Sequence, residues 1–261
     1  MNFARPSQQA FYGVSALLFA VSVVLTIRLC LSMPAMGMPM PGGWTMSMAW
    51  MRMPGQTWAG VAVSFLGMWI VMMVAMMLPS LVPMLQGYRR AVGTGEPHLG
   101  LQTTLVGLGY FFVWTVFGVT AFPVGAALAA TEMRHPELAR AVPIAAGVVV
   151  LIAGALQFTR WKIHHLACCR LTPGRGRTLP ADAGTAWRHG LRLGLHCSRC
   201  CAGLIAILLV IGVMDLRAMA VVMAAITLER LAPAGERVAR VIGGVVVGAG
   251  LFLIARAVWL G

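Results

Sequence analysis

Charge, and acidic charge above all, is scarce in this 261-residue chain. Only seven residues are Asp or Glu, charged residues make up 10% of the total, and hydrophobic residues make up 59%. In a soluble domain about a quarter of the residues are charged, so this composition excludes an ordinary soluble fold. The sequence also lacks a phosphate-binding loop, a nucleophile motif and a Cys-x-x-Cys-His haem attachment site, and we therefore expect no enzyme.

Seven hydrophobic segments contain most of the apolar residues. They lie at residues 11–31, 58–84, 99–130, 139–158, 203–214, 219–228 and 238–258. A helix needs ~20 apolar residues to cross a bilayer core about 30 Å thick. The fifth and sixth segments are shorter, so they either extend into their flanks or form a re-entrant hairpin. The sequence thus predicts an all-α, polytopic transmembrane helical bundle that forms one integral membrane domain over residues 1–261.

Positive charge is distributed unevenly between alternate loops. Of the 20 Lys and Arg residues, fourteen fall in the loops on the side of Arg5, Arg89 and the basic segment 160–199, and six fall on the other side. Cytoplasmic loops carry such an excess, so we expect a bacterial inner-membrane protein with a cytoplasmic N-terminus. We therefore interpret the net charge of +13 as the charge that orients the protein in the lipid bilayer. We expect no nucleic-acid partner. The sequence contains no signal for an oligomeric state.

A methionine-rich loop, residues 32–57, is predicted to lie on the extracytoplasmic side. It contains eight methionines, Met33, Met36, Met38, Met40, Met46, Met48, Met51 and Met53. Thioether is a soft, uncharged ligand that suits Cu(I) and is not lost to disulfides in an oxidising compartment. The repeated Met-x-Met spacing favours metal contact over the alternative, an apolar loop anchored at the headgroups by tryptophans.

The second hydrophobic segment carries further methionines on one side of its predicted helix. Met72 and Met76 lie on one stripe at 100° per residue, and Met73 and Met77 lie on the adjoining stripe. Packing explains a methionine stripe without any metal, and ligation of a migrating soft metal is the alternative. These four methionines are candidate ligands.

Two short runs on either side of the basic segment contain five of the six cysteines. The candidate metal ligands in them are His164, His165, Cys168 and Cys169, followed by His196, Cys197, Cys200 and Cys201. Spacings of three and four residues place Cys and His on shared helix faces. Thiols on the predicted cytoplasmic face stay reduced, so a metal site is favoured over disulfides. Vicinal cysteines beside His and Met suit a low-coordinate soft metal better than structural zinc.

The remaining polar and cysteine residues have simpler interpretations. We interpret Cys30 as a small apolar residue at a helix interface, and Glu229 beside Arg230 as an interfacial ion pair. Asp215 lies in the turn between the fifth and sixth segments, where it is either an external residue or, in a re-entrant hairpin, a functional charge at membrane depth.

Several motifs occur in a fixed order along the chain. They comprise Trp69, Met72, residues 75–79, Gln157, Lys162, Leu166, Cys169 with Arg170, Cys197-x-x-Cys200-Cys201, residues 212–214, Met219, Glu229, Pro233 and Gly235. In these motifs the chain resembles an uncharacterised bacterial family of predicted metal-binding integral membrane proteins. The resemblance implies a metal site. The chain departs from the family pattern at His165, where Cys is usual, at Ala202, where Trp is usual, and at Asp215, where Asn is usual.

Three functions fit these features. The first is uptake or transfer of copper, in which Cu(I) passes from the methionine-rich loop along the second segment to the Cys/His runs, because ligand strength rises from thioether to thiolate. The second is a non-transporting copper chaperone or a cuproenzyme assembly factor. The third is an importer of mercury or another thiophilic metal, and zinc is a further candidate ion. A periplasmic or cytoplasmic metallochaperone is the partner that we expect.

Overall fold

The computed structural model describes residues 4–32, 37–93, 96–170, 180 and 182–260, and within these ranges it confirms the all-α class. The helices are α1 (Ala4–Ser32), α2 (Trp58–Val92), α3 (Leu99–Arg134), α4 (Pro136–Leu156), α5 (Arg160–Arg170), α6 (Ala183–Ile211), α7 (Leu216–Leu231) and α8 (Gly235–Leu260). Two short strands, β1 (Met38–Met40) and β2 (Trp44–Met46), and the 3-10 turn η2 (Met48–Trp50) lie between α1 and α2.

Six helices in the described part of the chain, α1, α2, α3, α4, α6 and α8, are long and apolar enough to cross a membrane. The fifth predicted segment extends into its N-terminal flank, because α6 already begins at Ala183 and has 29 residues. The sixth predicted segment is the 16-residue α7. The basic segment 160–199 is therefore helical over α5 and the first half of α6.

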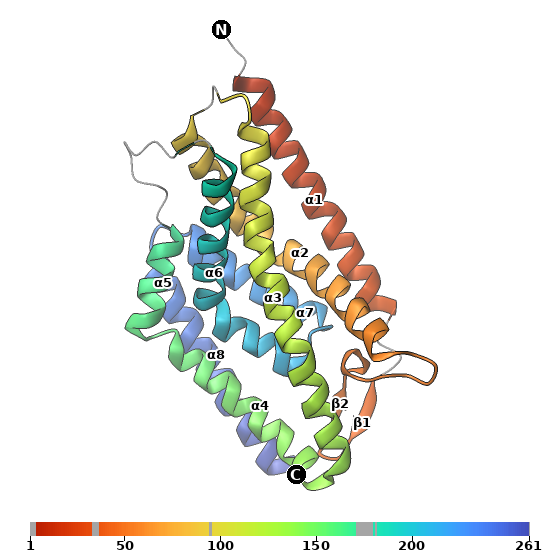
Figure 1. Cartoon of the computed structure of the whole chain (residues 1–261). Coiled ribbons are helices and arrows are strands. Elements are labelled where there is room, and N and C mark those ends of the chain that lie inside the picture. The colour runs from red at the N-terminus through yellow and green to blue at the C-terminus, as the bar shows by residue number, and fades with distance from the viewer. Residues whose placement is uncertain (1–3, 33–36, 94–95, 171–179, 181, 261) are drawn as a thin grey trace.

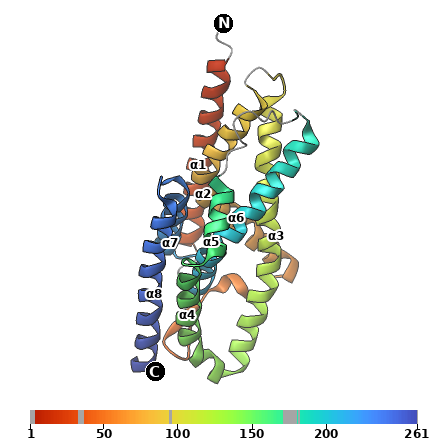
Figure 2. The ribbon, with the colours of Figure 1, turned by 90° about the vertical axis from the view of Figure 1, so that its left-hand side faces the viewer.

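The long helices run roughly along one axis, and α1 begins at the opposite end of the bundle from the end of α8 (Figure 1). We call the end that holds Arg89, Arg90 and the start of α6 the arginine end. The other end, which holds the β1–β2 hairpin, is the hairpin end. In the view of Figure 2, α8 and α3 lie on opposite sides of the molecule with α5 and α6 between them.

Glycines allow α3 and α6 to approach each other closely. A Cβ on Gly109 would lie 2.8 Å from the Trp187 carbonyl oxygen, and one on Gly194 would lie 2.9 Å from the Tyr110 carbonyl oxygen. Such contacts between helix backbones are typical of small-residue packing in membrane proteins. They place Tyr110 of α3 directly against the middle of α6.

One stripe of α6 is buried, and its residues are mostly small. The buried positions recur every three or four residues, at Ala186, Gly190, Gly194, Cys197, Cys201, Leu204 and Leu208. Arg188, Arg192 and Arg199 lie on the exposed side of the same helix. This amphipathic pattern directs the cysteines of α6 into the core of the bundle.

The turn between α6 and α7 is set by two residues. Gly212 has a φ of 140°, which favours glycine, and Asp215 caps α7 by accepting hydrogen bonds from the backbone nitrogens of Arg217 and Ala218. Asp215 therefore has a structural role at the N-terminus of α7.

The described part of the methionine-rich loop is folded against the helices. Strands β1 and β2 pair in an antiparallel hairpin, and the Trp44 Nε1 donates a hydrogen bond of 2.9 Å to the Ala139 carbonyl. Trp50 packs on Phe65 of α2, with ring centroids 4.9 Å apart. Met33 and Met36 lie outside the described residues.

Candidate metal centre

Four cysteine side chains are buried together in the middle of the bundle. Cys169 comes from the end of α5, and Cys197, Cys200 and Cys201 come from one face of α6. All four are free thiols, and none exposes more than 2% of its surface. We call these four residues the thiol core.

The thiols lie close together. Cys169 of α5 lies next to Cys200, and Cys197, Cys200 and Cys201 lie together on the buried face of α6. The Cys197 Sγ lies 2.9 Å from the hydroxyl of Tyr110 and 4.0 Å from the Sδ of Met77. The thiol core thus connects α5 and α6 with a hydroxyl on α3 and a thioether on α2.

A buried arginine faces this core. One Nη of Arg230 donates to the Cys169 Sγ at 3.4 Å, and the other donates to the Ser80 Oγ at 3.0 Å. Arg230 is 4% exposed and has no carboxylate partner among the described residues. An isolated buried charge is costly, so an anion in the thiol core would be strongly favoured.

The predicted ion pair between Glu229 and Arg230 is wrong. Glu229 pairs instead with Lys162, whose Nζ lies 2.6 Å from Glu229 Oε2 and 2.8 Å from the Cys200 carbonyl oxygen. Successive residues on a helix point about 100° apart, so Glu229 faces α5 while Arg230 faces the thiols. Lys162 and Glu229 neutralise each other, and the charge of Arg230 is left for the thiol core.

The histidines lie apart from the thiol core, together with Cys168. His164 and Cys168 are on the outer face of α5, with the His164 Nε2 3.8 Å from the Cys168 Sγ. The ring centroids of His165 and His196 are 6.3 Å apart, and His165 Nδ1 lies 2.8 Å from the Trp161 carbonyl oxygen. Within the described ranges, no three His, Cys, Asp or Glu side chains are arranged to hold a metal ion. The eight predicted ligands therefore divide into a buried group and a more exposed group.

The predicted methionine ligands of α2 are all buried in the same core. Met72, Met73, Met76 and Met77 are each at most 2% exposed. Met77 contacts the thiol core, and the other three lie nearer the hairpin end of the helix. Their burial fits packing, and their role as ligands stays a prediction.

Sequence reasoning did not identify Tyr110, Ser80 and Arg230 as neighbours of the cysteines. For Arg230 a signal existed, because a charged residue close to an apolar segment is often functional. For Tyr110 and Ser80 no local signal exists, since only the packing of α3 and α2 against α6 and α7 places them there.

A comparison with models of known protein families shows the family to which the chain belongs. A family model described as "PpoB2: Copper chaperone" matches residues 66–253. The chain belongs to this family. The matched region contains the whole thiol core, Lys162, Glu229 and Arg230. Searches of curated proteins and of solved structures gave no match. The family description supports the copper association expected from the sequence, and it favours the chaperone alternative over uptake.

Proposed function

We propose that this protein is a membrane-embedded copper chaperone that holds Cu(I) in the thiol core and passes it to a cuproprotein. The observation that supports this proposal most directly is the set of four buried thiols beside one uncompensated cation, Arg230. Thiolate and thioether are the ligands that select Cu(I).

The charge of the site favours Cu(I) over other thiophilic ions. A Cu(I) ion bound by two thiolates carries a single negative charge, which the guanidinium of Arg230 neutralises. An Hg(II) ion bound by two thiolates is neutral and would leave Arg230 uncompensated in a buried environment. Zinc usually takes four protein ligands in a structural site, whereas no three Cys, His, Asp or Glu side chains of the described residues are arranged to hold a metal ion.

A thioether beside the thiol core provides a chemical route for release of the metal. Met77 lies against Cys197, so a thioether can take over one position of the ion while a thiolate leaves. Thioether binds more weakly than thiolate because it is uncharged, so this exchange loosens the metal without a change of oxidation state. A chaperone needs such a reversible hold.

A copper titration tests the proposal. Protein purified without oxygen should bind Cu(I) in competition with a chromophoric chelator, and X-ray absorption should report sulfur ligands alone. Replacing Cys197 and Cys200 together by Ser should abolish the tight binding, while the neighbouring Ser198→Ala change should leave it intact. Tight binding that survives the loss of both thiols would refute the proposal.

A proteoliposome assay distinguishes the chaperone from the transporter. A chaperone should retain an amount of copper proportional to the protein present, with no accumulation in the lumen over time. Accumulation that continues after the protein is saturated would instead establish Cu(I) uptake. The same assay with Hg(II) tests the importer hypothesis.

A further inference from the structure

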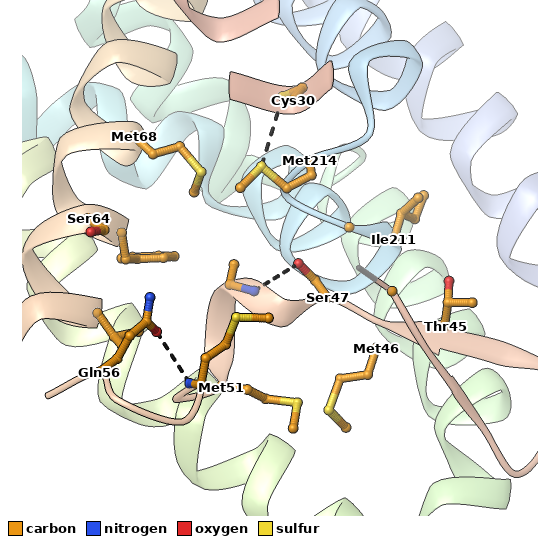
Figure 3. A pocket seen from close by; sticks show the side chains of 16 residues that line it. Cys30, Thr45, Met46, Ser47, Met51, Gln56, Ser64, Met68, Ile211 and Met214 are labelled. Carbon is orange, nitrogen blue, oxygen red and sulfur yellow. Dashed lines mark hydrogen bonds between the residues drawn. The ribbon is translucent and has the colours of Figure 1, made fainter. Parts of the chain in front are cut away.

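A sulfur-lined cavity of about 300 Å³ lies at the hairpin end, away from the thiol core. Figure 3 shows it between α1, α2, the methionine-rich loop and the turn that follows α6. Six of its lining residues carry sulfur, namely Cys30, Met46, Met51, Met53, Met68 and Met214. They come from four separate parts of the chain, so their convergence is a product of the tertiary fold.

Cys30 and Met214 are in contact through their sulfur atoms at this cavity. The Cys30 Sγ lies 3.9 Å from the Met214 Sδ, although the residues are 184 positions apart. In Figure 3 the sulfur of Met68 lies on the same side of the cavity as this pair, and Met46 and Met51 line the opposite side. Cys30 is buried, as expected, but it lines a cavity where we had expected simple helix packing.

The chemistry of the lining points to a soft, low-charge ion. Among the described residues no Asp, Glu, Lys, Arg or His lines the cavity, and the polar side chains that do are the hydroxyls of Thr45, Ser47 and Ser64 and the amide of Gln56. Hard cations such as Ca²⁺ and Mg²⁺ are usually held by carboxylate oxygens, and none of the described lining residues carries one. Thioethers with one thiol suit Cu(I).

A line of methionines leads from the cavity toward the thiol core. Met68 lines the cavity, and Met72 and Met76 follow it at intervals of one helical turn on the same stripe of α2. The next residue, Met77, contacts Cys197. At 1.5 Å per residue, Met68 and Met77 are about 14 Å apart along the helix.

We propose that this cavity is a Cu(I) acceptor site, in which Cys30, Met214 and Met68 take up the ion before it moves along α2 to the thiol core. This inference rests on the proposed function, because it takes copper as the cargo. The core offers several thiolates, whereas the cavity offers one thiol among thioethers, so transfer of the ion from the cavity to the core is downhill.

The test combines two sets of substitutions. The cavity variant carries Cys30→Ala, Met68→Leu and Met214→Leu, and the core variant carries Cys197→Ser and Cys200→Ser. Met84→Leu, on the same helix but outside the cavity lining, is the matched control. All are loaded from a chelator that holds free Cu(I) low, and both the loading rate and the final occupancy are measured.

The cavity variant should reach normal copper occupancy but load at least about tenfold more slowly. Loss of the groups that support a metal site costs ten- to hundredfold in metal affinity, and the loading rate falls with the occupancy of the acceptor site. The core variant should keep weakly bound copper with a sulfur-only X-ray absorption spectrum, and adding the cavity substitutions should remove it. If the three cavity substitutions prevent folding, the single change Cys30→Ser, made in the core variant, must still weaken the residual copper binding.

Normal loading by the cavity variant, or unchanged weak binding after the cavity substitutions, would overturn the acceptor site while leaving the thiol core intact. Failure of the unmodified protein to bind Cu(I) would instead refute the proposed function. The two failures are thus distinguishable.

Discussion

Adjacent residues on one helix have different surroundings in this protein. Cys169 is buried against Cys200 and Arg230, whereas Cys168 is half-buried beside His164 on the outer face of α5. The 100° rotation between successive residues separates them. The same rotation separates Glu229, which pairs with Lys162, from Arg230, which faces the thiols.

We predict that Cys169→Ser lowers Cu(I) affinity while Cys168→Ser does not. Cys169 and Cys200 belong to one site, so changing both should cost little more than changing either alone, because coupled residues are non-additive. Competition titrations with a Cu(I) chelator measure these affinities. Equal and additive losses from Cys168 and Cys169 would show two independent sites.

Replacing Arg230 should have opposite effects on the apo and the copper-bound protein. Arg230→Met removes an uncompensated buried charge, so the metal-free protein should be as stable as the unmodified one or more so. Cu(I) affinity should fall about ten- to hundredfold, since the anionic complex loses its counter-charge. Thermal unfolding with and without copper measures both effects, and Arg230→Lys, which keeps the charge, is the control. An unchanged affinity would contradict the charge argument.

The pair of Lys162 and Glu229 gives a stability prediction. Lys162→Met leaves the Glu229 carboxylate buried and unpaired, and should lower the free energy of unfolding by about 3–5 kcal/mol. Adding Glu229→Leu should recover most of the loss, because removing both charges leaves no uncompensated group. Titration of the detergent-solubilised protein with a denaturing detergent measures unfolding. A double variant as unstable as the single one would mean that the pair has another role.

At the scale of the elements, the contact of α3 with α6 positions the site. Gly109, Gly190 and Gly194 bring the two backbones together, and this approach places Tyr110 on Cys197. The position of the thiol core thus depends on helix residues that carry no side chain.

We predict that Gly190→Ala destabilises the protein by about 1–3 kcal/mol, the usual cost of overpacking. Its Cβ would press on the backbone carbonyl of Val106, which cannot move aside. Gly244→Ala is the matched control, because nothing lies within 4 Å of a Cβ there, and helix propensity should make it neutral or stabilising by up to ~1 kcal/mol. The free energy of unfolding should therefore fall in Gly190→Ala, and it should stay the same or rise in Gly244→Ala.

At the scale of the whole molecule, the path of the chain sets the sides of the termini. Six helices alone would place both termini on one side of a membrane. The short α7 runs back from the turn near Cys30 to the thiol core, and α8 then leads to the hairpin end. The start of α1 and the end of α8 therefore lie at opposite ends of the bundle (Figure 1).

We therefore predict termini on opposite sides of the membrane. Given the fourteen-to-six excess of Lys and Arg on one side, an N-terminal fluorescent protein should be bright in the cytoplasm. A C-terminal alkaline phosphatase should be active outside it. Reporters in the same compartment would mean that α7 does not act as a pass.

Much of the fold follows from the sequence because it depends on local periodicity and composition. The apolar segments determined the helical class, and the buried stripe of α6 can be read from the spacing of its small residues and cysteines. The arginines of α6 obscured that helix in the sequence, since they lower its average hydropathy while lying on its exposed side. The orientation of the bundle remains a prediction from charge.

The sequence by itself determined that soft metal ligands are clustered, and it located the clusters in the methionine-rich loop, the second hydrophobic segment and the two Cys/His runs. Only the tertiary structure decided which of them meet. Periodicity defines the faces of a helix, but the choice of the face that becomes core depends on the partner helix. Thus Cys169 enters the thiol core while Cys168 does not, Tyr110 reaches Cys197 from 87 residues away, and Cys30 meets Met214 at the cavity. Contacts between residues so far apart in the chain have no local signature, because they arise from the packing of whole helices.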